Sequence, residues 1–168
     1  TDQIQIDGVE TLIGTKHKPI PDRIEAGTFM IAAAITRGDV EINDIVPEHS
    51  NAVIEKLKES GAEITSTNNS IRVKMKHRPK AVNVETNAYP YFPTDMQAQM
   101  TALNSIAKGK SFVRENIFEN RFMHVQELER MGALIKVSDN TANILGAEKL
   151  LAAPVMATDL RASASLIL

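Results

Sequence analysis

A repeat of about 71 residues constrains this chain more than any other feature of its sequence. Two helical patterns end at Gly38 and Gly109, and two further helical patterns end at Gly61 and Gly132. The same spacing separates both pairs (109 − 38 = 71 and 132 − 61 = 71). A glycine after a helical pattern is the usual C′ residue of a helix. Two helix ends that recur at one offset therefore predict two copies of one structural unit.

Each copy is predicted to fold as a β-α-β-α-β-β unit, which makes the chain a mixed α/β protein. The helical patterns cover residues 24–38 and 53–62 in the first copy, and 95–109 and 125–133 in the second. Short β-branched or alternating runs between them predict the strands. These runs are Val40–Ile42, Glu63–Thr65, Ser70–Met75, Ser111–Val113 and Leu134–Val137. Asn68-Asn69 and Asp139-Asn140 predict the turns between the last two strands of each copy.

A third copy begins near the C-terminus. The sequence Thr94-Asp95-Met96 has its counterpart in Thr158-Asp159-Leu160, and an apolar run follows at 164–168. A helix that starts at Thr158 has little room before residue 168, so we expect a fragment. The expected units are residues 1–76 and 77–146, with 147–168 the beginning of a third. Each unit has one apolar helix face, so we expect the helices to pack inward against each other.

Composition argues against several classes of function. The net charge is −2, the pI is about 6.1 and aromatic residues make up 4% of the chain. These values argue against a nucleic-acid-binding surface. The longest apolar runs are too short to span a membrane, and the absence of cysteine excludes disulfides and thiolate metal sites within the chain. A cytoplasmic protein is the default expectation.

Acidic residues open the first helix of each copy. Asp22 is placed as an N-cap, and Thr94 is placed as the N-cap of a capping box with Gln97. Asp22, Asp95 and Asp159 could simply complement helix dipoles. Alternatively, equivalent helix starts could converge on one cleft, where an aspartate could act as a base toward a substrate hydroxyl.

Arginines form a second signal. Arg23 and Arg161 lie within a turn of these helix starts, and Arg121 precedes the second helix of the second copy. Guanidinium groups suit phosphate and carboxylate ligands, although solvated arginines at helix ends are equally compatible with the pattern. The four histidines have no ligand-like spacing, so no metal site is expected.

Four motifs in these segments resemble one enzyme family. They are P-D-R-I-E-A-G-T-F at 21–29, F-P-T-D-M-Q-A-Q at 92–99, E-N-R-F-M-H at 119–124 and A-T-D-L-R-A-S-A-S-L at 157–166. The chain resembles the bacterial UDP-N-acetylglucosamine enolpyruvyl transferases (1-carboxyvinyltransferases), over most of their C-terminal domain. The resemblance implies an inside-out α/β barrel in which two domains of three units face each other. Residues 1–168 would then form one incomplete C-terminal domain.

The resemblance also implies a reaction. The enolpyruvyl group of phosphoenolpyruvate would move to the 3-hydroxyl of UDP-N-acetylglucosamine, the first committed step of peptidoglycan synthesis, without a cofactor. Asp95 would bind the hydroxyl and act as its base, while Arg121 and Arg161 would support the phosphoenolpyruvate charges. Asp159 would take part in proton transfer, and Ile117 would give a backbone contact to the sugar nucleotide. Thr94 and Phe118 complete the implied substrate site.

The resemblance leaves some roles outside the chain or unassigned. The proton-donating cysteine and further cations of the family would lie in the N-terminal domain or beyond residue 168, so the fragment alone is expected to be inactive. Arg23 matches the family motif but receives no more than a supporting role. Three alternatives stay open: the sister enzyme that acts on shikimate 3-phosphate, a non-catalytic repeat module that binds RNA, and a degenerate paralogue.

Overall fold

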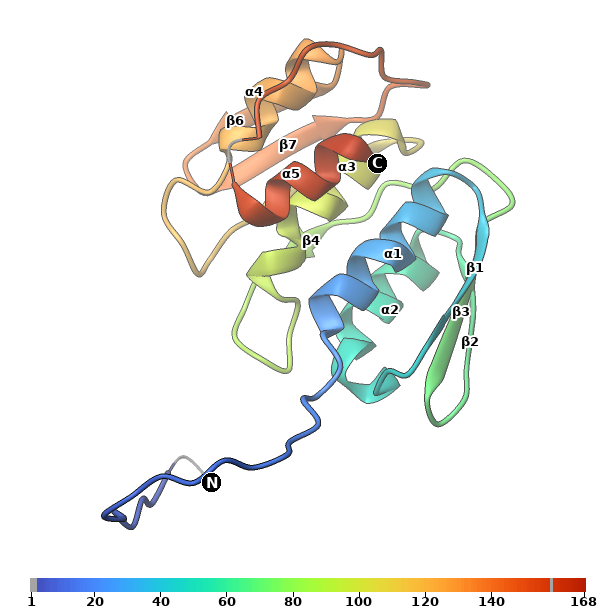
Figure 1. Cartoon of the computed structure of the whole chain (residues 1–168). Helices are drawn as coiled ribbons and strands as arrows, with labels where there is room; N and C mark the ends of the chain where they lie inside the picture. Colours follow the sequence, from blue (N-terminus) through green and yellow to red (C-terminus); the bar gives the residue numbers. More distant parts are fainter. Residues whose placement is uncertain (1–2, 158) are drawn as a thin grey trace.

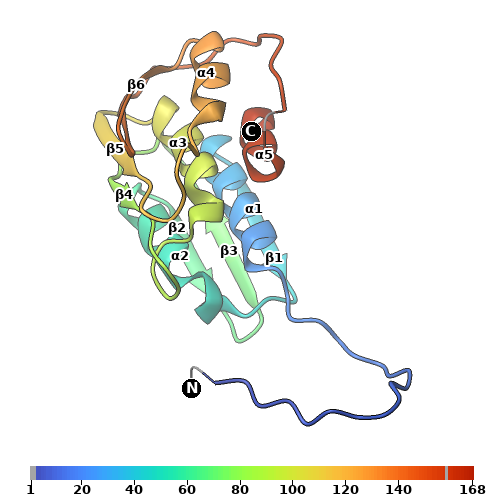
Figure 2. The same cartoon turned by 90° about the vertical axis from the view of Figure 1, so that its left-hand side faces the viewer.

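Three helices from successive units form the centre of the molecule. The computed structural model describes residues 3–157 and 159–168. In it, α3 (Gln97–Ile106) packs between α1 (Arg23–Ile35) and α5 (Leu160–Ile167), and the sheets lie outside these helices (Figures 1 and 2). The predicted inward packing of helices is therefore confirmed, as is the mixed α/β class.

The repeat is visible in the strands. The first unit holds β1 (Asp39–Asn43), β2 (Glu63–Ser66) and β3 (Ser70–Lys74), and the second holds β4 (Val84–Glu85), β5 (Lys110–Arg114), β6 (Leu134–Ser138) and β7 (Thr141–Leu145). The antiparallel order β1-β3-β2 matches β5-β7-β6, and β4 adds to β5 in parallel. The three matched strands begin 71 residues apart (110 − 39, 134 − 63 and 141 − 70). The offset read from glycines is thus the offset of whole strands.

Glycine ends the second helix of each unit as predicted. Helix α2 (Asn51–Glu59) follows the short 3₁₀ helix η1 (Pro47–Ser50), and α4 (Met123–Arg130) is its counterpart. Gly61 (φ 103°) and Gly132 (φ 94°) are the left-handed C′ residues of α2 and α4. The N–H of the following alanine bonds back to Leu57 O and Leu128 O respectively, which closes the helix end.

The predicted C′ position of the other two glycines was wrong. Helix α1 ends at Ile35, and Arg37 (φ 55°) takes the left-handed position one residue before Gly38. Helix α3 ends at Ile106, and its last turn passes into extended backbone at Ala107 instead of a glycine cap. Gly109 (φ 117°) serves the start of β5 instead, where its carbonyl accepts the N–H of Gly146.

The expected opening strand of the first unit is also absent from the described residues. Residues 3–22 run as an extended segment that projects from the body (Figure 1). Among residues 3–157 and 159–168, no strand pairs with the outer edge of β1, whereas β4 covers the matching edge of β5. A strand needs a partner for its backbone groups, and the described part of this segment has none.

Helix α3 is buried on nearly all sides, and several of its polar side chains form hydrogen bonds within the core. Every residue from Gln97 to Ser105 is buried. Asn104 makes two hydrogen bonds to the backbone of Val82, at 3.0 and 2.9 Å, which tie the segment before β4 to the helix. A Cβ on Gly27 of α1 would lie 2.9 Å from Met96 Cε, so the two units approach closely at this glycine.

Arg78 joins the end of the second unit to its beginning. Its guanidinium donates to four carbonyl oxygens, those of Ile106, Ala107, Gly146 and Ala147, at 2.7 to 3.1 Å. The carbonyls after α3 have no helical partners, so this arginine satisfies groups that would otherwise be left without one.

Candidate active site

The start of α3, the loop before α4 and the start of α5 surround one hollow. Its volume is about 370 Å³. Six of the expected site residues line this hollow. They come from these three segments and are Thr94, Asp95, Phe118, Arg121, Asp159 and Arg161. Helix starts from the second and third units therefore do converge, which the sequence offered as one of two alternatives.

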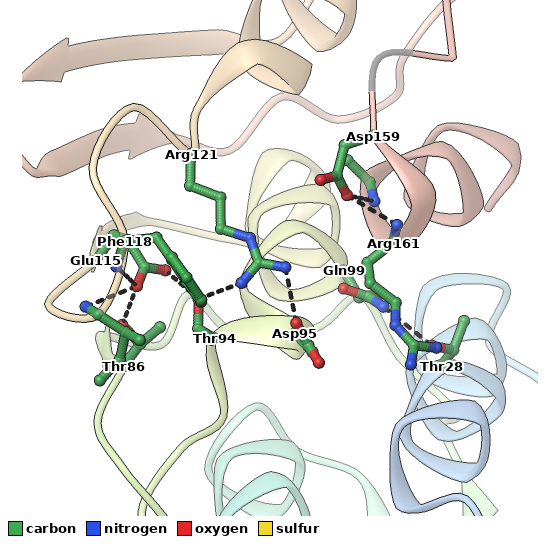
Figure 3. A network of polar contacts seen from close by, with 12 residues as sticks. Thr28, Thr86, Thr94, Asp95, Gln99, Glu115, Phe118, Arg121, Asp159 and Arg161 are labelled. Atoms are coloured by element: carbon green, nitrogen blue, oxygen red, sulfur yellow. Dashed lines mark hydrogen bonds and ion pairs between the residues drawn. The ribbon is translucent and has the colours of Figure 1, made fainter.

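Arg121 links two residues on the opposite wall. Its Nη1 donates to Thr94 Oγ1 and its Nη2 to Asp95 Oδ1, both at 2.7 Å (Figure 3). The guanidinium also lies over the ring of Phe118, 5.0 Å from the centroid. Three contacts of different kinds hold this arginine in one orientation. Asp95 keeps 40% of its side chain exposed, and no hydrogen bond to its second oxygen, Oδ2, is present among the described residues.

Thr94 does not cap the helix, which corrects the predicted capping box. Residues Thr94–Met96 form a short 3₁₀ helix, η2, whose N-cap is Pro93, and no side chain caps it. The hydroxyl of Thr94 bonds instead to Glu115 and Arg121. The Thr94 hydroxyl therefore bonds to side chains of the loop before α4 and not to the backbone N–H groups of its own helix. Asp95 likewise pairs with Arg121 and is not the first residue of a regular α-helix.

The start of α5 supplies the second acid and the second arginine. Asp159 caps this helix, accepting the N–H of Arg161 at 2.8 Å and of Ala162 at 2.9 Å. These backbone bonds, that of Ala162 first, hold the pKa of Asp159 below its usual range. Thr158, where the sequence placed the helix start, lies outside the described residues. Arg161 Nη2 lies 3.9 Å from Oδ2 of Asp22, whose other carboxylate oxygen, Oδ1, caps the start of α1.

Two expected residues lie apart from this hollow. Ile117 lines a larger neighbouring hollow of about 1030 Å³ on the other side of the loop, and its N–H donates to Glu115 Oε1 at 2.9 Å. Arg23 lies over the ring of Tyr89, 5.1 Å from the centroid, and lines neither hollow. The supporting role expected from the motif stays a prediction.

Sequence reasoning missed two buried polar residues in the hollow wall. His124 is 2% exposed and Gln97 is 1% exposed, and both line the hollow. Nε2 of His124 and both amide atoms of Gln97 have no hydrogen-bond partner among the described residues. Neither burial could be predicted from the sequence, because both residues appear within ordinary amphipathic helix patterns.

Burial of His124 predicts a pH-dependent stability. Burial lowers the pKa of His124 to about 4 from an ordinary value near 6.5, while Asp159 nearby opposes this shift. The unfolded chain then binds more protons than the native chain between pH 6.5 and 4, so stability falls as pH falls through this window. We expect a loss of about 2 kcal/mol between pH 7 and pH 5 in the full-length protein, measured by urea unfolding.

His124→Gln should remove most of this difference between the two pH values. His77→Gln, at an exposed position, is the matched control and should leave the difference unchanged. Equal pH dependence in wild type and His124→Gln would show that His124 does not titrate as described.

Two classes of site find no support in the part of the chain that the structure describes. No cluster of three or more metal-ligating side chains occurs among residues 3–157 and 159–168. Within the same ranges, no helix is both long and apolar enough to cross a membrane.

Solved structures share this fold. The enolpyruvyl transferase NikO from Streptomyces tendae matches with a TM-score of 0.74 and 24% identity, over 88% of this chain and 36% of that chain. EPSP synthase from Acinetobacter baumannii matches with a TM-score of 0.63 and 16% identity, over 87% of this chain and 36% of that chain. The fold is therefore the α/β fold of enolpyruvyl transferases.

Sequence comparison defines the family. The EPSP synthase (3-phosphoshikimate 1-carboxyvinyltransferase) family matches residues 1–168, and the chain belongs to this family. Curated relatives of the chain carry one name within this family, UDP-N-acetylglucosamine 1-carboxyvinyltransferase. That of Geobacter metallireducens is 58% identical over 168 residues, and that of Hydrogenovibrio crunogenus 56% identical over 169 residues. Each comparison covers all of this chain but 40% of the relative, so the chain spans less than half of their length.

Proposed function

We propose that the full-length protein transfers the enolpyruvyl group of phosphoenolpyruvate to the 3-hydroxyl of UDP-N-acetylglucosamine. The observation that carries this proposal is the pairing of Asp95 with Arg121 in a hollow that Arg161 also lines. The Asp95 carboxylate thus lies against one guanidinium that three contacts hold, and a second arginine lines the same hollow. The names of relatives at 54–58% identity support the choice of acceptor.

The side chains suit the two stages of such a transfer. Asp95 would take the proton of the sugar 3-hydroxyl as the hydroxyl oxygen bonds to C2 of phosphoenolpyruvate. At the same time, C3 would gain a proton from a donor outside this chain. The tetrahedral intermediate would then lose a C3 proton and inorganic phosphate, which restores the double bond. Asp159 is our candidate for proton transfer at C3. Arg121 and Arg161 would bind the phosphate and carboxylate charges in both stages.

The remaining predicted residues would hold the acceptor. Thr94 and Phe118 flank Arg121, and the backbone at Ile117 would contact the sugar nucleotide. We propose no cofactor, because the enol of the donor already supplies the reactive carbon. The N-terminal domain of the same enzyme would close the site from the opposite side, in the cytoplasm, at the first committed step of peptidoglycan synthesis.

A second candidate acceptor is shikimate 3-phosphate. The description of the matching family names that reaction, and EPSP synthase shares the fold. The EPSP synthase of Acinetobacter baumannii is 16% identical to this chain, far below the 58% of the sugar-nucleotide enzyme from Geobacter metallireducens, which favours the latter.

Phosphate release separates the two. We expect the full-length protein to release inorganic phosphate from phosphoenolpyruvate when UDP-N-acetylglucosamine is present, and not when shikimate 3-phosphate replaces it. The opposite result would assign the sister reaction. Absence of release with both acceptors would contradict transferase activity, and salt-dependent binding of RNA would then be the next measurement.

A further inference from the structure

A buried carboxylate lies behind the candidate active site and touches both of its walls. Glu115 follows β5 directly and is 3% exposed. Its Oε1 accepts Thr86 Oγ1 at 2.8 Å and the N–H groups of Ile117 at 2.9 Å and Phe118 at 3.2 Å. Its Oε2 accepts Thr94 Oγ1 at 2.9 Å. Figure 3 shows these bonds meeting on one side chain.

The set of partners is unusual for a buried acid. All four are neutral donors, and no ion pair to Glu115 is present among the described residues. Burying a carboxylate is costly unless hydrogen bonds replace the lost water. A neutral side chain of similar size would avoid that cost. The carboxylate supplies something that such a side chain lacks, which is acceptor capacity without any donor.

Because the Glu115 carboxylate only accepts hydrogen bonds, it determines the direction of the bonds in the active site. Arg121 can only donate, so Thr94 Oγ1 accepts from it and must give its own hydrogen to Glu115. Arg121 then bonds through its second nitrogen to Asp95. Glu115 therefore fixes the rotation of the Thr94 hydroxyl, and through it the position of the guanidinium beside the proposed base.

The same carboxylate also orients the loop backbone. The N–H of Phe118 points to Glu115, and in a trans peptide the carbonyl of the preceding residue points the opposite way. The carbonyl of Ile117 is thus directed away from the buried acid. This is the residue whose backbone is proposed to contact the sugar nucleotide.

We propose that Glu115 is a positioning residue of the transferase site, acting through Thr94 on Arg121 and Asp95 and through the backbone on Ile117. The proposal rests on the proposed function. It assigns to Glu115 no contact with substrate, and its effect is on the geometry of groups that have such contacts.

Glu115→Gln in the full-length protein tests this. Glutamine keeps the size of the glutamate side chain but replaces one acceptor oxygen with an NH₂ donor. This donor would face another donor, either the Thr94 hydroxyl or the loop N–H groups. We expect kcat to fall at least about tenfold and KM for UDP-N-acetylglucosamine to rise several-fold. The thermal midpoint and circular dichroism spectrum should stay close to those of wild type. Glu85→Gln is the matched control, on the neighbouring strand in an exposed ion pair with Arg114, and should keep wild-type kinetics.

A double-mutant cycle with Thr94→Val measures the coupling between the two residues in kcat. A purely structural role of Glu115 would not produce this coupling. If the two residues act as one relay, the double variant should lose no more kcat than the worse single variant. Additive losses, a kcat loss that tracks a lowered thermal midpoint, or wild-type kinetics in Glu115→Gln would each overturn the proposal. If Glu115→Gln does not fold, folded Thr94→Val decides: a lowered kcat with an unchanged KM for UDP-N-acetylglucosamine supports the relay, whereas a wild-type kcat, or a loss confined to KM, refutes it.

The assay also separates this proposal from the function on which it rests. A wild-type protein that is inactive with UDP-N-acetylglucosamine would refute the proposed function before any variant is measured, and this proposal with it. An active wild type with a fully active Glu115→Gln variant would refute the positioning role alone.

Discussion

Asp95→Asn should abolish most turnover of the full-length protein while leaving its fold intact. Asparagine can still accept the Arg121 hydrogen bond at Oδ1, so the arginine has no reason to move. It cannot take the proton of a substrate hydroxyl, and loss of a general base typically costs 10²–10⁴-fold in rate. We expect a fall in kcat of about this size, measured by phosphate release, with an unchanged thermal midpoint.

Asp139→Asn is the matched control for this variant. It makes the same chemical change at an exposed turn with φ 53°, a conformation that asparagine tolerates. Near-normal turnover in Asp95→Asn would remove Asp95 from the mechanism and leave the other acid of the hollow, Asp159, as the candidate base.

Gly146→Ala should destabilise the protein more than any surface substitution. A Cβ at this position would lie 1.7 Å from the carbonyl oxygen of Ala107. Neither backbone can give way easily, because Arg78 binds the carbonyls of both residues and the N–H of Gly146 bonds to Gly109. We expect a loss of at least about 3 kcal/mol in the free energy of unfolding.

Urea unfolding followed by circular dichroism would measure this loss. Gly14→Ala adds the same methyl group where no atom lies within 4 Å, and should change stability by less than about 0.5 kcal/mol. Equal stability of the two variants would show that the segments around Ala107 and Gly146 can separate without cost.

The repeat made most of the fold predictable. Strand patterns located β1–β3, β5 and β6, and the turn at Asp139-Asn140 together with the repeat implied β7. The errors lie at a helix end and at the edge of a sheet. Arg37 takes the C′ position before Gly38, and residues 3–22 meet no partner strand among the described residues. Neither outcome is visible in a local pattern of residue types.

The sequence predicted which residues gather at the candidate site, but not the hydrogen bonds between them. Motifs identified Asp95, Arg121, Asp159 and Arg161, and the structure brings all four to one hollow. The sequence placed Thr94 in a capping box, whereas its hydroxyl connects Glu115 to Arg121. Glu115 itself carried no sequence signal, since a glutamate after a strand is ordinarily a solvated residue. Its partners come from three separate segments, which only the fold assembles.

The strands of the described units pair only within their own unit, and α3 links the units by packing on both α1 and α5. The sheet of the first unit lies within residues 39–74 and that of the second within residues 84–145, and neither shares a hydrogen-bonded strand with the other. Packing of α3 on α1 and α5 is therefore the route by which folding of one unit becomes cooperative with folding of the next. Since α3 also begins beside Asp95, the residues that make the chain fold cooperatively are continuous with those that we propose carry out its chemistry.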